Sequence, residues 1–136
     1  MDESGTTATI LYVTHLAVII ANVGDSRAVI SQWQNSGRLS AYQLTIDHVV
    51  SSQDEQLLIA ERGGSVSKSG GIERLNGILA VSRSLGDINL AQFLSRTPHV
   101  LSLTKHEAYQ LCDMQIDSKI KHPRPCFIIL ASDGLW

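Results

Sequence analysis

The sequence predicts an α+β fold whose centre is built from antiparallel β-strands. Three observations lead to this expectation: four apolar or alternating segments in the first third of the chain, short polar links between them, and a helix-start signal that comes only afterwards. Parallel strands need crossover connections of about a dozen residues, and no helix-length segment separates the first four strands. A doubly wound parallel sheet is therefore not supported.

The stretch from residue 17 to residue 30 consists of two apolar segments around a polar turn at residues 24–27. Val and Ile dominate both segments, which predicts two strands joined by a hairpin turn. Segments this continuously apolar are typical of strands that are covered on both faces. With their neighbours they are expected to form a four-strand antiparallel meander: residues 9–13, 17–23, 28–31 and 38–45.

A helix is predicted after the meander. Ser52 and Glu55 have the spacing of a capping box, and the helix is expected to end at the glycine pair Gly63–Gly64. A second glycine pair, in residues 68–71, predicts a hinge. The later elements are expected in this order: a short strand at 65–67, a short helix at 88–94, a strand at 100–103, a helix with a loop or an insertion at 104–125, and a closing strand at 127–131.

Composition limits the possible function classes. The 136 residues have about one domain's length, and 43% hydrophobic residues are ample for a packed core. A formal charge of −2, with one short basic patch at 119–124 that fits a solvated loop, argues against a nucleic-acid-binding surface. No apolar run approaches the roughly 20 residues of a membrane span, and the acidic N-terminus does not resemble a signal peptide.

The two cysteines, Cys112 and Cys126, do not form a disulfide framework or a zinc-spaced cluster. Cys126 opens an apolar strand and is expected to be a small buried side chain. An intracellular compartment, cytoplasmic or nuclear, fits this use of cysteine, and the protein is expected to be a monomer.

Two carboxylates follow or precede apolar strands and are the candidate metal ligands. Asp25 lies in the turn at 24–27, and Asp133 comes directly after the closing strand. Carboxylate oxygens suit hard divalent cations, so both could meet at one ion. Each also has a structural explanation: Asp25 as a turn residue paired with Arg27, and Asp133 as the cap of a following helix.

Other polar residues give weaker indications. Asp47 and His48 suggest acid–base chemistry, since histidine titrates near neutral pH, but neighbouring residues of a strand point to opposite faces. A surface turn is the preferred interpretation for this pair. Ser82 and Ser84 lie near Arg83 with no base positioned beside them, so no nucleophile constellation is evident.

Four blocks of sequence, taken together, resemble the metal-dependent serine/threonine phosphatases of the PP2C (PPM) family. They are Gly-Thr-Thr-Ala at 5–8, Ala-Asn-Val-Gly-Asp-Ser-Arg at 21–27, Asn-Gly-Ile-Leu-Ala-Val-Ser-Arg-Ser-Leu-Gly-Asp at 76–87, and Ile-Ile-Leu-Ala-Ser-Asp-Gly-Leu-Trp at 128–136. Asp47–His48 and Gly63–Gly64 also fall at the intervals that the family uses. The order and spacing make coincidence an inadequate explanation.

The resemblance implies a four-layer αββα sandwich in which helices flank two antiparallel sheets. It implies hydrolysis of phosphoserine and phosphothreonine in phosphoprotein substrates by water activated by two Mg²⁺ or Mn²⁺ ions, with a third in some members. By the same resemblance Asp133 is a core metal ligand and Asp25 holds the additional, weaker ion. Residues 49–74 correspond to the family's flap, which influences substrate access, and Arg83 and Asp87 are given a structural role.

This sequence also departs from the family pattern. Val49 and Val50 stand where Lys-Pro is usual, and the Asp-Gly-His-Gly block, the phosphate-binding arginine and the later Asp-Asn block do not occur in it. The resemblance therefore implies that residues 1–136 are the central, incomplete portion of a phosphatase domain. The family's general acid lies outside this chain, so no catalytic residue is assigned here, and the chain alone is expected to be inactive.

Two further hypotheses remain open from the sequence. The chain could belong to a pseudophosphatase or regulatory protein-binding module that kept the sandwich without the metals. It could also be a β-rich binding domain with no phosphatase ancestry. Intact aspartates at positions 25 and 133 favour the enzyme family over both.

Overall fold

The computed structural model describes residues 3–113 and 124–136. Strands predominate, and they are joined by two α-helices and two short 3₁₀ helices. The elements in chain order are β1 (Gly5–Thr6), β2 (Ala8–Val13), β3 (Ala17–Val23), β4 (Arg27–Trp33), β5 (Leu39–Gln43), α1 (Gln53–Glu61), β6 (Val66–Ser69), β7 (Ile72–Leu75), β8 (Leu85–Gly86), η1 (Ile88–Leu90), β9 (His99–Thr104), α2 (Lys105–Cys112), β10 (Ile128–Ala131) and η2 (Asp133–Leu135).

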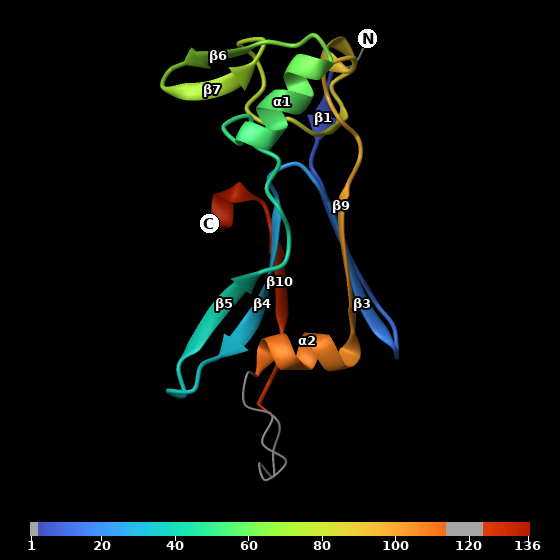
Figure 1. Ribbon diagram of the computed structural model, residues 1–136, viewed down its shortest axis with the longest axis vertical. Coiled ribbons are helices and arrows are strands. Elements are labelled where there is room, and N and C mark those ends of the chain that lie inside the picture. Colours follow the sequence, from blue (N-terminus) through green and yellow to red (C-terminus); the bar gives the residue numbers. More distant parts are fainter. Residues whose placement is uncertain (1–2, 114–123) are drawn as a thin grey trace.

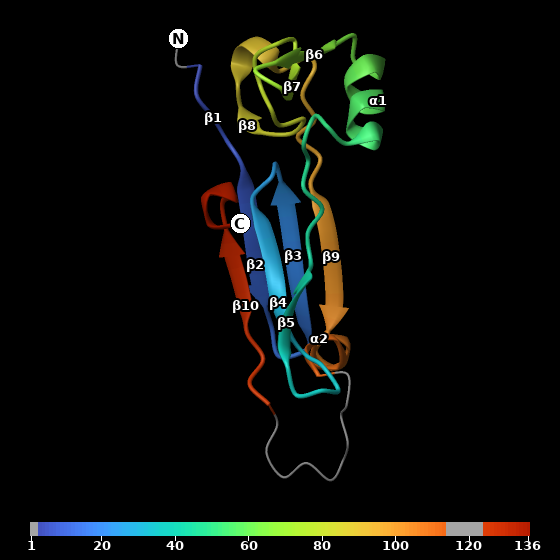
Figure 2. The ribbon, with the colours of Figure 1, turned by 90° about the vertical axis from the view of Figure 1, so that its left-hand side faces the viewer.

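Two three-stranded antiparallel sheets form the body of the molecule (Figure 1). One sheet has the order β2-β3-β9 and the other β10-β4-β5, so each is built around one of the two most apolar strands. Residues 49–97, which we call the upper lobe, lie beyond one end of both sheets, and α2 lies at the other end (Figure 2). The α+β class and the two antiparallel sheets are confirmed.

The predicted hairpin between β3 and β4 is wrong. β3 pairs with β2 and β9, whereas β4 pairs with β5 and β10, so the turn between β3 and β4 carries the chain from one sheet to the other. The four strands consequently do not form one meander. Both strands are central in their own sheets and have partners on both edges, which fits the apolar runs at 17–21 and 28–30.

A core fills the space between the sheets. Alternate side chains of β3 and β4 point inward, as the period of two in a strand requires. The buried cluster draws on both sheets and on α2, and it contains Val18, Ile20, Ala28, Ile30, Leu44, Ala108 and Cys112. Packing across the two sheets therefore holds the body of the molecule together.

α2 closes the lower end of the sandwich, and the capping box at its start was not predicted. Thr104 and Glu107 form a complete capping box: the Thr104 amide donates to the Glu107 carboxylate at 2.7 Å, and the Glu107 amide donates to Thr104 Oγ1 at 3.2 Å. The prediction of a helix at the start of the segment 104–125 is confirmed; the part from 114 to 123 lies outside the described residues.

The upper lobe has a small core of its own beside α1 and the β6–β7 hairpin. Its buried members are Val50, Ile59, Leu75, Leu90 and Leu94. The predicted helix ends as expected, with Gly63 at a φ of +76°. Gly70 and Gly71 form the two-residue turn of the β6–β7 hairpin, with φ values of +60° and +85°, where the sequence predicted a hinge.

The capping box predicted at Ser52 and Glu55 is wrong. Ser52 occupies the N-cap position of α1 but makes no side-chain cap bond. The Glu55 carboxylate is instead held by Ser82 and Arg83 of the segment after β7. An arginine guanidinium is the stronger partner for a carboxylate, so the tertiary ion pair replaces the local cap.

Of the helix predicted at 88–94, only η1 forms, followed by turns. The strands predicted at 100–103 and 127–131 are confirmed as β9 and β10. Among the described residues, no helix combines the length and the apolar character that crossing a membrane requires.

Candidate metal centre

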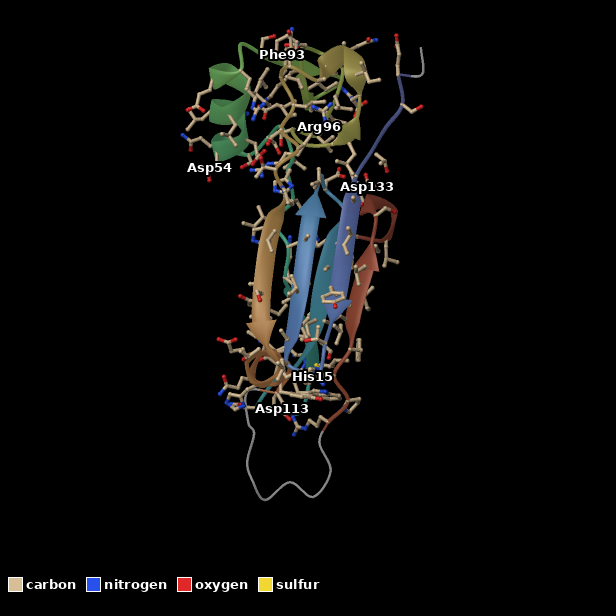
Figure 3. The ribbon with its side chains drawn as sticks, turned by 90° about the vertical axis from the view of Figure 1, so that its right-hand side faces the viewer. His15, Asp54, Phe93, Arg96, Asp113 and Asp133 are labelled. Atoms are coloured by element: carbon tan, nitrogen blue, oxygen red, sulfur yellow. The ribbon has the colours of Figure 1, made fainter. Side chains whose placement is uncertain are left out.

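The candidate site lies at the end of the sandwich where β4 begins and β10 ends. Ala131 of β10 lies opposite Arg27 of β4, so continuing the antiparallel register by two residues brings Asp133 to Asp25. Figure 3 shows Asp133 at the end of the sheets next to the upper lobe, with His15 at the opposite end. Sheet pairing therefore gathers both candidate ligands at one end of two neighbouring strands.

The Asp25 turn is held by the backbone of Gly24. The His48 amide donates to Gly24 O at 3.0 Å, and the Gly24 amide donates to His48 Nδ1 at 3.2 Å. Asn22 Nδ2 donates to Gly24 O at 3.0 Å and to Ile46 O at 2.9 Å. Both side chains are buried, so this network fixes where the turn presents Asp25.

The sequence indicated that His48 lies in a surface turn, but this prediction is wrong, because only 1% of His48 is exposed. Burial, followed by the charge of Arg83, lowers the pKa of His48 below its usual value. The ring is therefore neutral at pH 7, and its unprotonated Nδ1 is the atom that accepts from Gly24. Its role in this structure is to hold the turn.

Thr7 and Ser26 close the other side of the turn. Their hydroxyl oxygens lie 2.7 Å apart and share a hydrogen bond. Gly24 has a φ of +96°, and a Cβ there would stand 2.3 Å from Thr7 Cγ2. Glycine is therefore required for both the backbone conformation and the close approach of Thr7.

The sequence suggested that Arg27 pairs with Asp25, but the structure shows a different partner for Arg27. Its guanidinium binds Asp47, with Nε 3.2 Å from each carboxylate oxygen, and lies over the Trp136 ring at 5.5 Å from the centroid. Hydrogen bonding to Asp47 raises the pKa of Arg27 further. The charge of Arg27 is thus committed to Asp47 and not to Asp25.

The electrostatics around Asp25 favour a cation. Burial raises the pKa of the Asp25 carboxyl, its own backbone hydrogen bond lowers it, and the charges of Asp133 and Asp47 raise it again. No ion pair neutralises Asp25 or Asp133 within residues 3–113 and 124–136. Two neighbouring carboxylates in this state fit a divalent ion, which would relieve their repulsion.

An open cleft of about 400 Å³ adjoins Asp25. One wall comes from the β6–β7 hairpin, including Lys68 and Glu73, and the other from Val49 and Ser51. Across the described part of the chain, no group of three or more His, Cys, Asp or Glu side chains converges. The two aspartates therefore offer part of a ligand set.

The residues that orient the turn were missed by the sequence reasoning. Asn22 lies within an apolar strand and is fully buried, and Ser26 is 9% exposed. Buried polar groups are almost always hydrogen-bonded. An asparagine inside an apolar strand, three residues before Asp25, was the available signal.

Solved structures share this architecture. A C. elegans sex-determining protein matches 75% of this chain and 24% of its own, with a TM-score of 0.69 and 27% identity. A serine-threonine phosphatase 2C from Toxoplasma gondii matches 74% of this chain and 37% of its own, with a TM-score of 0.66 and 24% identity, which speaks for the fold alone. The fold is that of the phosphatase 2C class of α+β sandwiches.

Sequence comparison makes the assignment specific. The family model described as Protein phosphatase 2C matches residues 1–136, and the chain belongs to this family. It is 37% identical over 137 residues to probable protein phosphatase 2C 17 from Arabidopsis thaliana, covering 99% of this chain and 41% of that protein. It is 39% identical over 138 residues to probable protein phosphatase 2C 44 from Oryza sativa subsp. japonica, covering 100% and 36%. The chain thus spans about two-fifths of the length of these relatives.

Proposed function

We propose that this chain is the central part of a phosphatase domain that hydrolyses phosphoserine and phosphothreonine in proteins with the help of Mg²⁺ or Mn²⁺. Family membership supports the reaction class. The observation that carries the proposal is the pairing of β4 with β10, which gathers Asp25 and Asp133 at one end of the sandwich. Further metal ligands, the general acid and the phosphate-binding arginine are expected from outside this chain.

Asp25 and Asp133 would hold the ions through their carboxylate oxygens. A bound divalent ion supplies charge neutralisation for the phosphate and an acidified water for its hydrolysis. Asp133 lies at the start of η2, directly after a paired strand, so its position follows that of β10. Asp25 is positioned by the buried Asn22–Gly24–His48 network, which leaves its carboxylate as an acceptor toward the cleft.

The cleft beside Asp25 gives the substrate a place to approach. The β6–β7 hairpin forms one wall, and this hairpin belongs to the segment that resembles the family's flap. A phosphoprotein segment entering along the hairpin would bring its phosphate toward the two aspartates. The chain's own contribution is therefore to orient two ligands and to line the approach.

The proposal is tested by Mn²⁺-dependent turnover of a phosphothreonine peptide by the full-length protein and its variants. Asp133→Asn should weaken Mn²⁺ activation by at least about tenfold, since even changes around metal ligands cost about 10–100-fold. Asp54→Asn is the matched control, because this exposed carboxylate lies on α1 and away from Asp133 (Figure 3). Unchanged Mn²⁺ dependence in the Asp133→Asn variant would refute the assignment.

The 136-residue chain alone should not turn over p-nitrophenyl phosphate with Mn²⁺, because two aspartates do not complete a two-ion site.

Flanking coding sequence with Asp-Gly-His-Gly upstream and Asp-Asn downstream would agree with an enzyme. Partner binding by the full-length protein without any turnover would favour the pseudophosphatase or regulatory module instead.

A further inference from the structure

The two cysteines come together at the end of the sandwich opposite the aspartates. Cys112 is the last residue of α2 and is 1% exposed. Cys126 precedes β10 and is exposed, so the predicted burial of Cys126 is wrong. The strand begins only at Ile128, which leaves Cys126 in the connecting segment outside the sheet. One cysteine is thus covered, whereas the other belongs to an exposed segment of the chain.

Ser31 of β4 holds the two cysteines in place. Its Oγ lies 3.3 Å from Cys112 Sγ and accepts a hydrogen bond from the Phe127 amide at 3.0 Å. The Ser31 amide donates to Phe127 O at 2.9 Å, and Cys112 Sγ lies 3.9 Å from Pro125 O. Cys126, between Pro125 and Phe127, is therefore fixed on both sides, and the segment that carries it lies against the Cys112 thiol.

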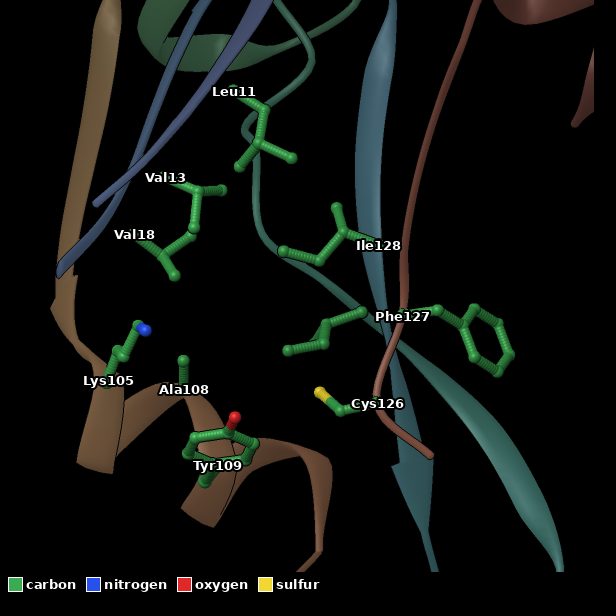
Figure 4. Close-up of a pocket in the computed structure, with 10 residues that line it drawn as sticks. Leu11, Val13, Val18, Lys105, Ala108, Tyr109, Cys126, Phe127 and Ile128 are labelled. Carbon is green, nitrogen blue, oxygen red and sulfur yellow. The ribbon is translucent and has the colours of Figure 1, made fainter. Parts of the chain in front are cut away.

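The direction of the Cys126 side chain agrees with this contact. Figure 4 shows its sulfur pointing toward α2, into an apolar cavity of about 340 Å³ beside Ala108 and Tyr109. Because Cys112 Sγ lies 3.9 Å from the carbonyl oxygen of the residue before Cys126, the two side chains are neighbours, and a disulfide between them requires their rotation into its specific geometry. Neither cysteine has any part in the candidate metal centre.

We propose that Cys112 and Cys126 form a reversible oxidation site that a small-molecule disulfide, such as oxidised glutathione, converts to an intramolecular disulfide. The Cys126 thiolate, having lost its proton to solvent, attacks one sulfur of the small disulfide, whose S–S bond breaks and releases one thiol. The Cys112 thiol then gives up its proton and its sulfur attacks Cys126 Sγ; the mixed disulfide bond breaks, and the departing sulfur takes up a proton to give the second thiol. Two protein thiols are oxidised and one small disulfide is reduced to two thiols.

The environment of Cys126 makes the first step slow at neutral pH. Burial of the sulfur, followed by the hydrogen bond to Cys112, raises the pKa of Cys126 to about 12. The reactive thiolate is then scarce at neutral pH. As long as the pH stays below that pKa, each increase of one pH unit raises the thiolate fraction about tenfold. The site should therefore respond over long exposures to oxidant and increasingly as the pH rises.

The disulfide would tie the end of α2 to the segment that leads into β10. Asp133 comes two residues after the far end of β10, so the covalent link would restrain the strand that leads to this residue. A link that closes an intervening segment stabilises a protein mainly by restricting its unfolded chain. Oxidation should therefore raise the melting temperature.

The test is mass spectrometry of the reduced protein after incubation with oxidised glutathione, blocking of free thiols and digestion with trypsin. Lys119 and Lys121 separate the cysteines, so Cys112 falls in the peptide 106–119 and Cys126 in the peptide that begins at His122. We expect these two peptides to be joined, at a rate that rises about tenfold from pH 7 to pH 8. Cys112→Ser should stop at glutathione attached to Cys126, and Cys126→Ser should block the reaction at Cys112.

Several results would overturn the proposal. Stable glutathione adducts at both cysteines, or dimers linked through Cys126, would show that the native thiols cannot reach each other. Equal joining of the two peptides in native and urea-unfolded protein would show that the fold does not favour the bond. The readout does not involve phosphatase activity, so it stands or falls separately from the proposed function.

Discussion

Replacing Glu55 by alanine should destabilise the protein more than any change on the exposed face of the same helix. One oxygen of the Glu55 carboxylate accepts hydrogen bonds from Ser82 Oγ at 2.6 Å and from Arg83 Nε at 3.0 Å. The other oxygen accepts a hydrogen bond from Arg83 Nη2 at 2.5 Å. The two side chains of the ion pair are 6% and 15% exposed. The pair therefore joins α1 to the segment after β7 from inside the upper lobe.

The size of the effect follows from what the truncation leaves behind. Removing one partner of a buried ion pair costs about 3–5 kcal/mol, because the remaining charge stays buried. Arg83 keeps its hydrogen bond to Thr97 O at 2.7 Å and is partly solvated, which places the cost near about 3 kcal/mol. At about 2 cal/mol/K of unfolding entropy per residue, this lowers the melting temperature by about 10 °C.

Urea unfolding followed by circular dichroism measures the loss directly. Glu61→Ala, at the exposed end of α1, is the matched control and should change the free energy of unfolding by no more than about 0.5 kcal/mol. Glu55→Gln keeps the shape and the Ser82 contact, so it remains measurable if the alanine variant does not fold. A Glu55→Ala variant as stable as Glu61→Ala would refute the reasoning.

Three more outcomes are expected. Burial by itself raises the pKa of Glu55, but the hydrogen bonds from Arg83 and Ser82 outweigh burial, so the pKa is lowered overall. The stability that Glu55 confers should therefore be complete above the ordinary glutamate pKa and be lost as the pH falls through the lowered pKa. Melting temperatures measured over an acid pH series check this expectation. Gly24→Ala should cost more stability than Gly37→Ala, since both have positive φ but nothing lies within 4 Å of a Cβ at position 37; equal losses would contradict this. Asn22→Ala should lower the free energy of unfolding by about 1–3 kcal/mol and weaken Mn²⁺ binding. Urea unfolding measures the first effect, and calorimetric titration of the full-length protein measures the second. A loss of stability with unchanged Mn²⁺ binding would show that Asn22 does not position Asp25.

Local patterns in the sequence were sufficient to place most strands. β3 and β4 were predicted from runs of Val and Ile, and β10 from the apolar segment before Asp133. The partner of each strand was not predictable in the same way. A tight turn between two apolar strands fits a hairpin within one sheet and a crossing between two sheets equally well, and packing across the core decides between them.

The candidate site was also predicted only in part: its residues were identified, but most of their partners were not. Asp25 and Asp133 were identified as strand-end carboxylates, and the β4–β10 register supplies the reason that they approach. The partners of Arg27 and Glu55 were assigned wrongly, and the buried position of His48 was missed, because each of these residues binds a group that is far away in the sequence. A capping-box spacing cannot reveal that an arginine from a distant segment will compete for the same glutamate.

The most direct test of a shared cation at Asp25 and Asp133 is paramagnetic broadening by Mn²⁺ in the NMR spectrum of the ¹⁵N-labelled full-length protein. We expect substoichiometric Mn²⁺ to broaden the backbone amide signals of residues 24–26 and 132–134 first, and to leave those of His15 and Asp113 sharp. Broadening that begins elsewhere, or that affects only one of the two turns, would contradict a cation held jointly by these two carboxylates.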